Sequence, residues 1–112
     1  MLRVGNLDAE RDLADVRDVA AAYATLAAHG ERATAYNVCT GRAYRIGDLL
    51  EMLLTRARVP IRVEVDPERV RAIERPRLLG DNSRLRTLGW SPQVPIETTI
   101  QDVLDYWRAE PA

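Results

Sequence analysis

The 112-residue sequence contains no lysine, one cysteine and one histidine. A single cysteine excludes an internal disulfide bond, and one cysteine with one histidine excludes an ordinary zinc site. No apolar run approaches the ~20 residues that span a membrane, and the first residues do not have the pattern of a secretory signal. We therefore expect a cytoplasmic protein without a structural metal ion and without membrane contact.

Neither sign of charge dominates, because 16 arginines stand against 17 acidic residues and the net charge is −1. This balance argues against bulk electrostatic binding to nucleic acid or to an anionic membrane, and no aromatic clusters suggest base stacking. Arginine is the only fixed cation, and its planar guanidinium suits paired phosphate oxygens. Genomic base composition is nevertheless the simpler explanation for the replacement of every lysine.

The apolar pattern predicts one α/β domain over residues 1–112, with the element order β-α-β-α-β-α-α. Asp15 is a suitable N-cap for the first helix, and His29 with Gly30 supplies its stop. A helical turn that begins at Pro67 follows the last strand. The expected strands are residues 2–7, 35–38 and 61–66, and the expected helices are residues 16–28, 46 to about 59, 82–88 and 95–107.

Four segments resemble, in the same order, extended short-chain dehydrogenases of the NAD-dependent epimerase/dehydratase family. The similarity is greatest to the GDP-6-deoxy-4-keto-D-mannose reductases and then to the GDP-mannose 4,6-dehydratases. It implies the small C-terminal, nucleotide-sugar-binding domain of a Rossmann-type enzyme. The matching segments are residues 4–19 (VGNLDAERDLADVRDV), 36–41 (YNVCTG), 71–82, and 88–92 with 94–97 (LGWSP and VPIE).

Two parts of such an enzyme are missing from the sequence. The family binds its dinucleotide with a Gly-x-x-Gly-x-x-Gly loop, and the six glycines here never fall at that spacing. The family also pairs a catalytic tyrosine with a lysine four residues later, and this chain has no lysine. We therefore expect no catalytic and no cofactor-binding residues in this chain, which corresponds to the C-terminal third of the family. The resemblance implies NADP or NAD as the cofactor of the full-length enzymes.

Arg11 is the first candidate binding residue. The resemblance implies that this arginine contacts the substrate diphosphate, through a charge-assisted and bidentate hydrogen bond. Asp12 could orient it, while Leu13 departs from the phenylalanine usual in the family. The alternative is an exposed Arg-Asp pair of little energetic weight.

Arg71 and Glu74 are the second candidate. The resemblance implies that Arg71 binds the diphosphate and that Glu74 accepts hydrogen bonds from ribose hydroxyls or the guanine edge. Arg75 replaces an apolar residue of the family pattern, which leaves the loop conformation open. Without the family pattern, residues 69–77 would be read as a solvated charged loop.

Val4 and Asn6 are weaker candidates. The resemblance implies that backbone groups near this strand lie beside the nucleobase, but an ordinary turn at the end of the strand explains these residues equally well. Cys39 is expected to be a buried structural cysteine, since no histidine lies nearby. His29 is explained as a helix cap. Tyr44 lacks the following lysine and is not assigned as a catalytic phenol.

The resulting hypothesis is the substrate-binding part of a GDP-4-keto-6-deoxymannose reductase, inactive on its own, so that its status as an enzyme stays open. The alternatives are the corresponding part of a GDP-mannose 4,6-dehydratase, a lyase, or a non-catalytic module that binds a nucleotide sugar or associates with itself. In the family, the first helix and residues 36–39 lie against the cofactor domain. Their exposure here would favour a homodimer.

Overall fold

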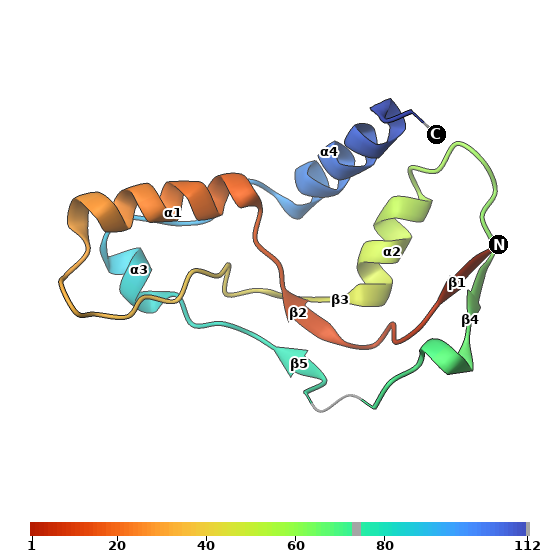
Figure 1. Ribbon diagram of the computed structural model, residues 1–112, viewed down its shortest axis with the longest axis horizontal. Coiled ribbons are helices and arrows are strands. Elements are labelled where there is room, and N and C mark those ends of the chain that lie inside the picture. Colours follow the sequence, from red (N-terminus) through yellow and green to blue (C-terminus); the bar gives the residue numbers. More distant parts are fainter. Residues whose placement is uncertain (73–74, 112) are drawn as a thin grey trace.

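The computed structural model describes residues 1–72 and 75–111 and confirms the α/β class. Figure 1 shows short strands and helices joined by long connections. No helix in the described part of the chain is long and apolar enough to cross a bilayer. The elements are β1 (Leu2–Val4), β2 (Glu10–Asp12), α1 (Val16–His29), β3 (Ala43–Arg45), α2 (Ile46–Leu54), β4 (Val63–Val65), the 3-10 helix η1 (Pro67–Arg69), β5 (Arg77–Leu78), α3 (Ser83–Thr87) and α4 (Ile96–Ala109).

The strands form two small sheets. In the first, β1 pairs in parallel with β4, with Leu2 opposite Val63. In the second, β2 lies in the middle, antiparallel to β3 and parallel to β5. The predicted first strand therefore ends at Val4, and β2, β3 and β5 are strands that the periodicity did not predict. They contain only two or three residues each, too few for an alternating pattern to be recognised.

The predicted strand at residues 35–38 is wrong. This segment runs beside the connection that leads into α3 (Figure 1). Polar side chains join the two segments in place of a backbone ladder. Asn37 Nδ2 donates to the carbonyl of Asp81 at 3.2 Å, and Asn82 Nδ2 donates to the carbonyl of Cys39 at 2.9 Å. The expectation that this run is buried is also wrong, because Ala35 and Asn37 are exposed and Cys39 is half-buried.

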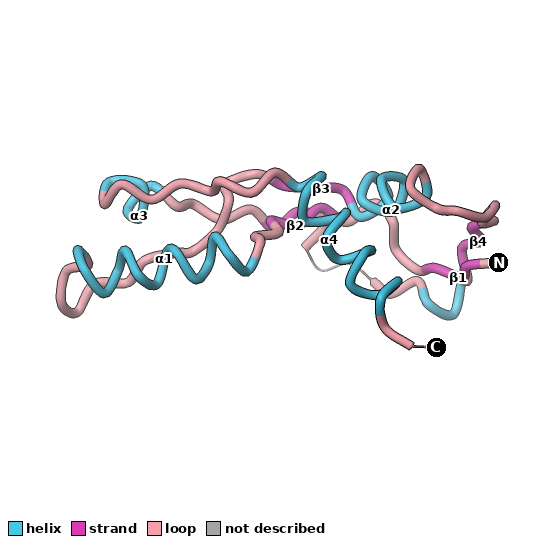
Figure 2. Tube along the Cα trace, turned by 90° about the horizontal axis from the view of Figure 1, so that it is seen from above, coloured by secondary structure: helices cyan, strands magenta, loops and turns pink. Residues whose placement is uncertain are grey.

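Helix α1 begins as predicted at Asp15, whose carboxylate accepts from Arg17 N at 2.8 Å. The helix packs on a small core in which Ala22 and Leu85 are fully buried and Trp90 is nearly so. At the other end of the molecule α4 packs against α2, where Arg56 Nε donates to Gln101 Oε1 at 3.1 Å. Figure 2 shows α1 and α4 along one side, with β2, β3, α2 and α3 along the other.

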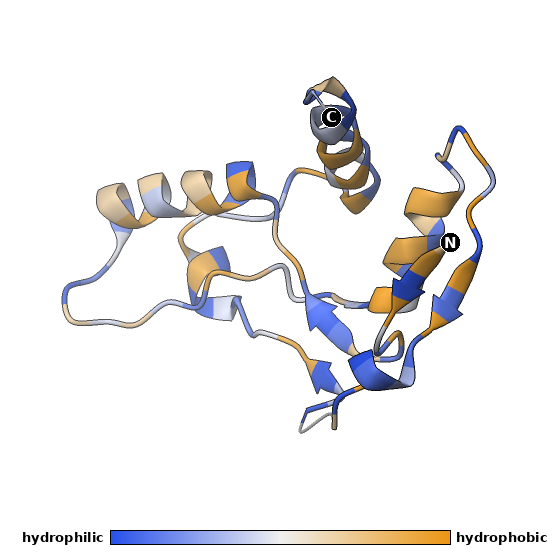
Figure 3. Cartoon of the chain, turned by 45° about the vertical axis from the view of Figure 1, so that its right-hand side comes forward, coloured by the Kyte–Doolittle hydropathy of each residue, from blue (hydrophilic) through white to orange (hydrophobic). Residues whose placement is uncertain are grey.

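The molecule is open for its size. Its Cα radius of gyration is 17.0 Å, against about 13 Å for a compact chain of this length. Its accessible surface is 8265 Å², about 2,000 Å² more than a folded monomer of this mass exposes. Large apolar side chains contribute to this excess, among them Val16 (77% exposed), Tyr23 (63%) and Trp107 (67%). Figure 3 shows apolar residues along α2 and α4.

Candidate functional site

The end of β1 contacts the segment that follows β4, residues 66–71. Asp66 N donates to the carbonyl of Val4 at 2.8 Å, which extends the β1–β4 ladder by one bond. A Cβ atom added at Gly5 would collide with the carbonyl of Arg69. Glycine therefore allows the two backbones to approach closely at this point. The chain that enters from β4 is thus aligned along residues 4–6 as it leads to Arg71.

Asn6 then binds the backbone of Arg71 with both ends of its side-chain amide. Its Nδ2 donates to the carbonyl of Arg71 at 2.7 Å, and its Oδ1 accepts from Arg71 N at 3.1 Å. An amide that is used in this way satisfies one backbone donor and one backbone acceptor together. The structure therefore places Asn6 against residue 71, sixty-five positions along the chain.

Arg11 holds the other end of the same segment. Its Nη1 donates to the carbonyls of Glu10 at 2.7 Å and Arg75 at 3.0 Å, with that of Pro76 at 3.5 Å. The backbone adds a bond from Glu10 N to Pro76 O at 2.7 Å. Among the described residues only Nη1 of this guanidinium is used, and a guanidinium has five donors. Arg11 can therefore hold the segment and still bind an anion.

These contacts enclose a cleft of about 560 Å³ with a basic rim. Arg11 and Arg71 line it together although sixty residues separate them, and Arg75 adds a third guanidinium that the sequence did not single out. None of the three forms an ion pair with an acidic residue in the described part of the chain. The lining residues are Asn6, Ala9, Arg11, Ile46, Arg71, Ala72, Arg75 and Leu78.

The other predicted site residues are placed differently. Val4 lies in the β1–β4 ladder opposite Val65 and is not among the residues that line the cleft. Glu74 lies outside the described residues. The suggestion that Asp12 orients Arg11 is wrong, because neighbouring side chains on a strand point to opposite faces. The Asp12 carboxylate instead faces Thr40 and the backbone of two glycines.

Asp12 is a structural acceptor. It binds Thr40 N at 2.9 Å, Thr40 Oγ1 at 2.6 Å, Gly41 N at 2.8 Å and Gly80 N at 3.4 Å. Burial raises the pKa of Asp12, but the hydrogen bonds from Thr40, Gly41 and Gly80 outweigh it and hold the pKa below the usual value. Gly41 supports this arrangement with a φ of 78°, a left-handed conformation that glycine adopts without strain.

Asp15 and Asp18 bind distant segments in the same manner. Asp15 also accepts from Thr99 Oγ1 at 2.6 Å, which joins α1 to α4. Asp18 is buried and accepts from the backbone N–H groups of Gln93 at 3.0 Å and Val94 at 3.1 Å. From the sequence, Asp15 was expected only to cap the first helix.

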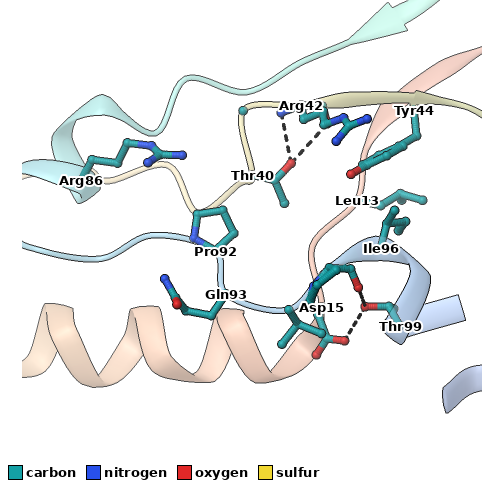
Figure 4. Close-up of a pocket in the computed structure, with 13 residues that line it drawn as sticks. Leu13, Asp15, Thr40, Arg42, Tyr44, Arg86, Pro92, Gln93, Ile96 and Thr99 are labelled. Atoms are coloured by element: carbon teal, nitrogen blue, oxygen red, sulfur yellow. Dashed lines mark hydrogen bonds between the residues drawn. The ribbon is translucent and has the colours of Figure 1, made fainter. Parts of the chain in front are cut away.

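A second cleft, of about 470 Å³, lies beside these acids (Figure 4). Arg42 stacks over the ring of Tyr44 with its guanidinium carbon 4.8 Å from the ring centroid. Thr40 Oγ1 accepts from Arg42 N at 3.1 Å, and the bond from Thr99 Oγ1 to Asp15 Oδ2 belongs to the same lining. The stacked Arg42 covers the Tyr44 ring, and the described lining contains no lysine or histidine to act on the phenol.

Cys39 has the environment of a structural thiol. Burial is the main cause that raises its pKa, and the charge of Asp12 adds to it, which disfavours the reactive thiolate. The side chain packs against Gly80, where an added Cβ atom would collide with it. Within residues 1–72 and 75–111, no three His, Cys, Asp or Glu side chains gather in a way that could hold a metal ion.

The fold matches one part of a known class of enzymes. The chain superposes on the structure of RMD from Pseudomonas aeruginosa in complex with NADPH with a TM-score of 0.89 and 37% identity, over 96% of this chain and 36% of that chain. It also superposes on UDP-glucose 4-epimerase from Thermotoga maritima with a TM-score of 0.80 over 96% of this chain and 34% of that one, where 23% identity shows the fold alone. The structure is that of the C-terminal part of extended short-chain dehydrogenases.

The sequence comparisons give the family. The family model described as GDP-mannose 4,6 dehydratase matches residues 1–103. GDP-6-deoxy-D-mannose reductase from Pseudomonas aeruginosa is 39% identical over 109 residues, which are 96% of this chain and 36% of that protein. The chain belongs to the GDP-mannose 4,6-dehydratase family, as the resemblance of its motifs predicted. It spans about a third of the length of this curated relative.

Proposed function

We propose that this chain is the nucleotide-sugar-binding portion of a reductase that acts on a GDP-linked 4-keto-6-deoxymannose and yields a GDP-rhamnose type product. The observation that carries the proposal is the cleft on which Arg11, Arg71 and Arg75 converge. Three guanidinium groups without acidic partners among the described residues suit a ligand with two phosphates. The 39% identity to a GDP-6-deoxy-D-mannose reductase supports the choice of substrate class.

The roles within this cleft follow from the donors that remain available. Arg71 is exposed, and its guanidinium would bind the diphosphate together with the unused Nη2 and Nε groups of Arg11. The apolar side chains of Ile46 and Leu78 line the same cleft and would contact the less polar faces of the nucleoside or the sugar. Glu74 remains the predicted acceptor for ribose hydroxyls or the guanine edge.

Reduction requires a hydride donor and a proton donor, and this chain supplies neither in the form that the family uses. NADPH accompanies the related RMD structure, so we propose that NADP or NAD is bound by a part that corresponds to the remaining length of the relatives. We therefore propose that the isolated chain binds the nucleotide sugar without turnover. A cytoplasmic location and the absence of nucleic-acid binding stay predictions from the sequence.

A GDP-mannose 4,6-dehydratase is the alternative within the family, and the description of the matching family model favours it. Both enzymes would use the same diphosphate cleft, so binding of GDP does not separate them. Competition with GDP-mannose separates them better. Preference for GDP-mannose over GDP-rhamnose would favour the dehydratase, and the reverse would favour the reductase. A non-catalytic module would also bind the nucleotide. It would differ from both enzymes because no added cofactor-binding domain would give it reductase or dehydratase activity.

We also propose that the chain associates with itself. The excess surface of about 2,000 Å² exceeds the ~800 Å² per partner that a standard interface buries. The expected strand edge at residues 35–38 does not exist, so association would use apolar helix surface. Val16 on α1 and Trp107 on α4 are the most exposed large apolar side chains of these helices.

Calorimetric titration of the chain with GDP tests the proposal. Arg71→Ala should weaken GDP binding by about 10- to 150-fold, the range for the loss of a charge-assisted hydrogen bond. Arg58→Ala is the matched control, because Arg58 is also exposed and does not line the cleft. Equal affinities of the two variants, or no GDP binding by the unaltered chain, would refute the proposed site.

A further inference from the structure

The contact between Asn6 and Arg71 continues the β1–β4 ladder with a side chain. The ladder itself ends at Val4 and Val65, and the bond from Asp66 N to Val4 O follows it. Two residues beyond the end of β1, the Asn6 amide binds both backbone groups of Arg71. A side-chain amide thus replaces a strand backbone at the position where regular pairing has stopped.

These two bonds fix the residue that carries the proposed phosphate contact. Among the described residues, they are the only hydrogen bonds that Arg71 makes. The Arg71 side chain is left free to line the cleft, while the backbone is held in one place. A long side chain on an unsupported loop loses more conformational entropy when it binds an anion, so the support raises affinity.

Gly5 makes the same alignment possible from the neighbouring position. A Cβ atom at residue 5 would collide with the carbonyl of Arg69, which is backbone and cannot rotate away as the end of a side chain can. Any larger residue here would displace the chain two residues before Arg71. Gly5 and Asn6 therefore act on the same segment by different means, one by leaving space and the other by hydrogen bonding.

We infer that Asn6 is a positioning residue for the nucleotide diphosphate, which it serves through Arg71 and without touching the ligand. The inference rests on the proposed function and replaces the direct contact that the sequence suggested for Asn6. Both ends of the Asn6 amide are engaged with Arg71, which explains why an asparagine suits this position. Asn6 also lines the cleft, and each amide end keeps one further donor or acceptor, so the experiment has to separate positioning of Arg71 from direct contact with the ligand.

A double-mutant cycle on GDP affinity separates positioning from contact. Asn6→Ala alone should weaken GDP binding by about tenfold, within the range for a lost hydrogen bond to a charged group. In an Arg71→Ala background, Asn6→Ala should have almost no further effect, because no guanidinium remains to be placed. Asn37→Ala is the matched control, since Asn37 also binds a distant backbone carbonyl but lies away from the cleft.

Each outcome is informative. If both single variants weaken binding and their effects multiply in the double variant, Asn6 contacts the ligand directly and the inference is wrong while the proposed function stands. If Arg71→Ala leaves GDP affinity unchanged, the proposed function itself fails. Gly5→Ala provides a second variant with the Asn6 side chain intact, and it should weaken GDP binding in the same non-additive manner with Arg71→Ala.

Amide hydrogen exchange provides a readout that requires no ligand. Asn6→Ala should accelerate exchange at the Arg71 N–H by at least about tenfold, because it removes the acceptor of that group. Exchange at Gly30 N, which donates within α1, should not change. Unchanged exchange at Arg71 would overturn the inference whatever the GDP titrations show.

Discussion

Asp18→Asn tests the claim that Asp12, Asp15 and Asp18 join distant segments of the fold. Asp18 is 4% exposed and receives hydrogen bonds from Gln93 N at 3.0 Å and Val94 N at 3.1 Å. Asparagine keeps the shape but removes the charge, and its NH2 group must face one of the two N–H donors. One charge-assisted bond is lost and the other weakened, which predicts a loss of about 2–4 kcal/mol in the free energy of unfolding.

Asp48→Asn is the matched control for this substitution. Asp48 is the third residue of α2, as Asp18 is of α1, but its side chain is 59% exposed and pairs only with the half-buried Arg45 among the described residues. Both variants lose the interaction with the helix dipole, about 0.3–1 kcal/mol. Only Asp18→Asn loses the bonds to residues 93 and 94, so the difference between the variants isolates the tertiary contribution.

Urea unfolding followed by tryptophan fluorescence is a suitable assay. Trp90 Nε1 donates to the carbonyl of Asp18 at 3.0 Å, so Trp90 emission reports on the contact between α1 and the segment that contains residues 93 and 94. The midpoint of the Asp18→Asn transition should fall well below that of Asp48→Asn at an unchanged slope. If the two variants have the same free energy of unfolding, the hydrogen bonds of Asp18 to residues 93 and 94 do not stabilise the fold and the role assigned to Asp18 is wrong.

Three further predictions concern stability and association. Hydrogen bonds hold the pKa values of Asp12 and Asp15 below the usual 3.8, so the stability that these carboxylates contribute is complete above that pH and should be lost as the pH falls below it. In urea unfolding at a series of pH values, Asp12→Asn should lose less stability on acidification than the unaltered chain, and an unchanged pH profile would count against this role. Gly41→Ala should lower stability by about 1–2 kcal/mol, since its φ of 78° strains an L-residue, and an unchanged melting temperature would contradict the backbone geometry. Sedimentation at micromolar concentration should show a dimer, whereas a single 12.6 kDa species would reject self-association.

The helices were predictable in position because each has an apolar stripe or a clear boundary, although α2 ends at Leu54 and not near residue 59 as predicted. Asp15 is the N-cap of α1 in the structure as in the prediction, and the helix ends at His29 as the following glycine indicates. The short strands were not predictable, because β2, β3 and β5 exist through pairing between distant segments. Residues 35–38 have a strand-like composition, but among the described residues they have no strand beside them, so tertiary context decides against the local preference.

The cleft was predictable only in part. The family motifs indicated Arg11, Arg71 and Asn6, and the structure brings these three to one cleft. Composition and spacing could not show that Asn6 binds the backbone of Arg71, since the two lie sixty-five residues apart. Arg75 was read as a departure from the family pattern, and its place in the lining appears only once β5 pairs with β2.

Crystallography of the chain with GDP tests the central claim most directly. The account predicts that the diphosphate lies in the cleft of Arg11, Arg71 and Arg75, with Asn6 still bound to the backbone of Arg71. A diphosphate bound in the second cleft, beside Arg42, would contradict the assignment, as would a crystal grown in excess GDP that has no nucleotide in either cleft.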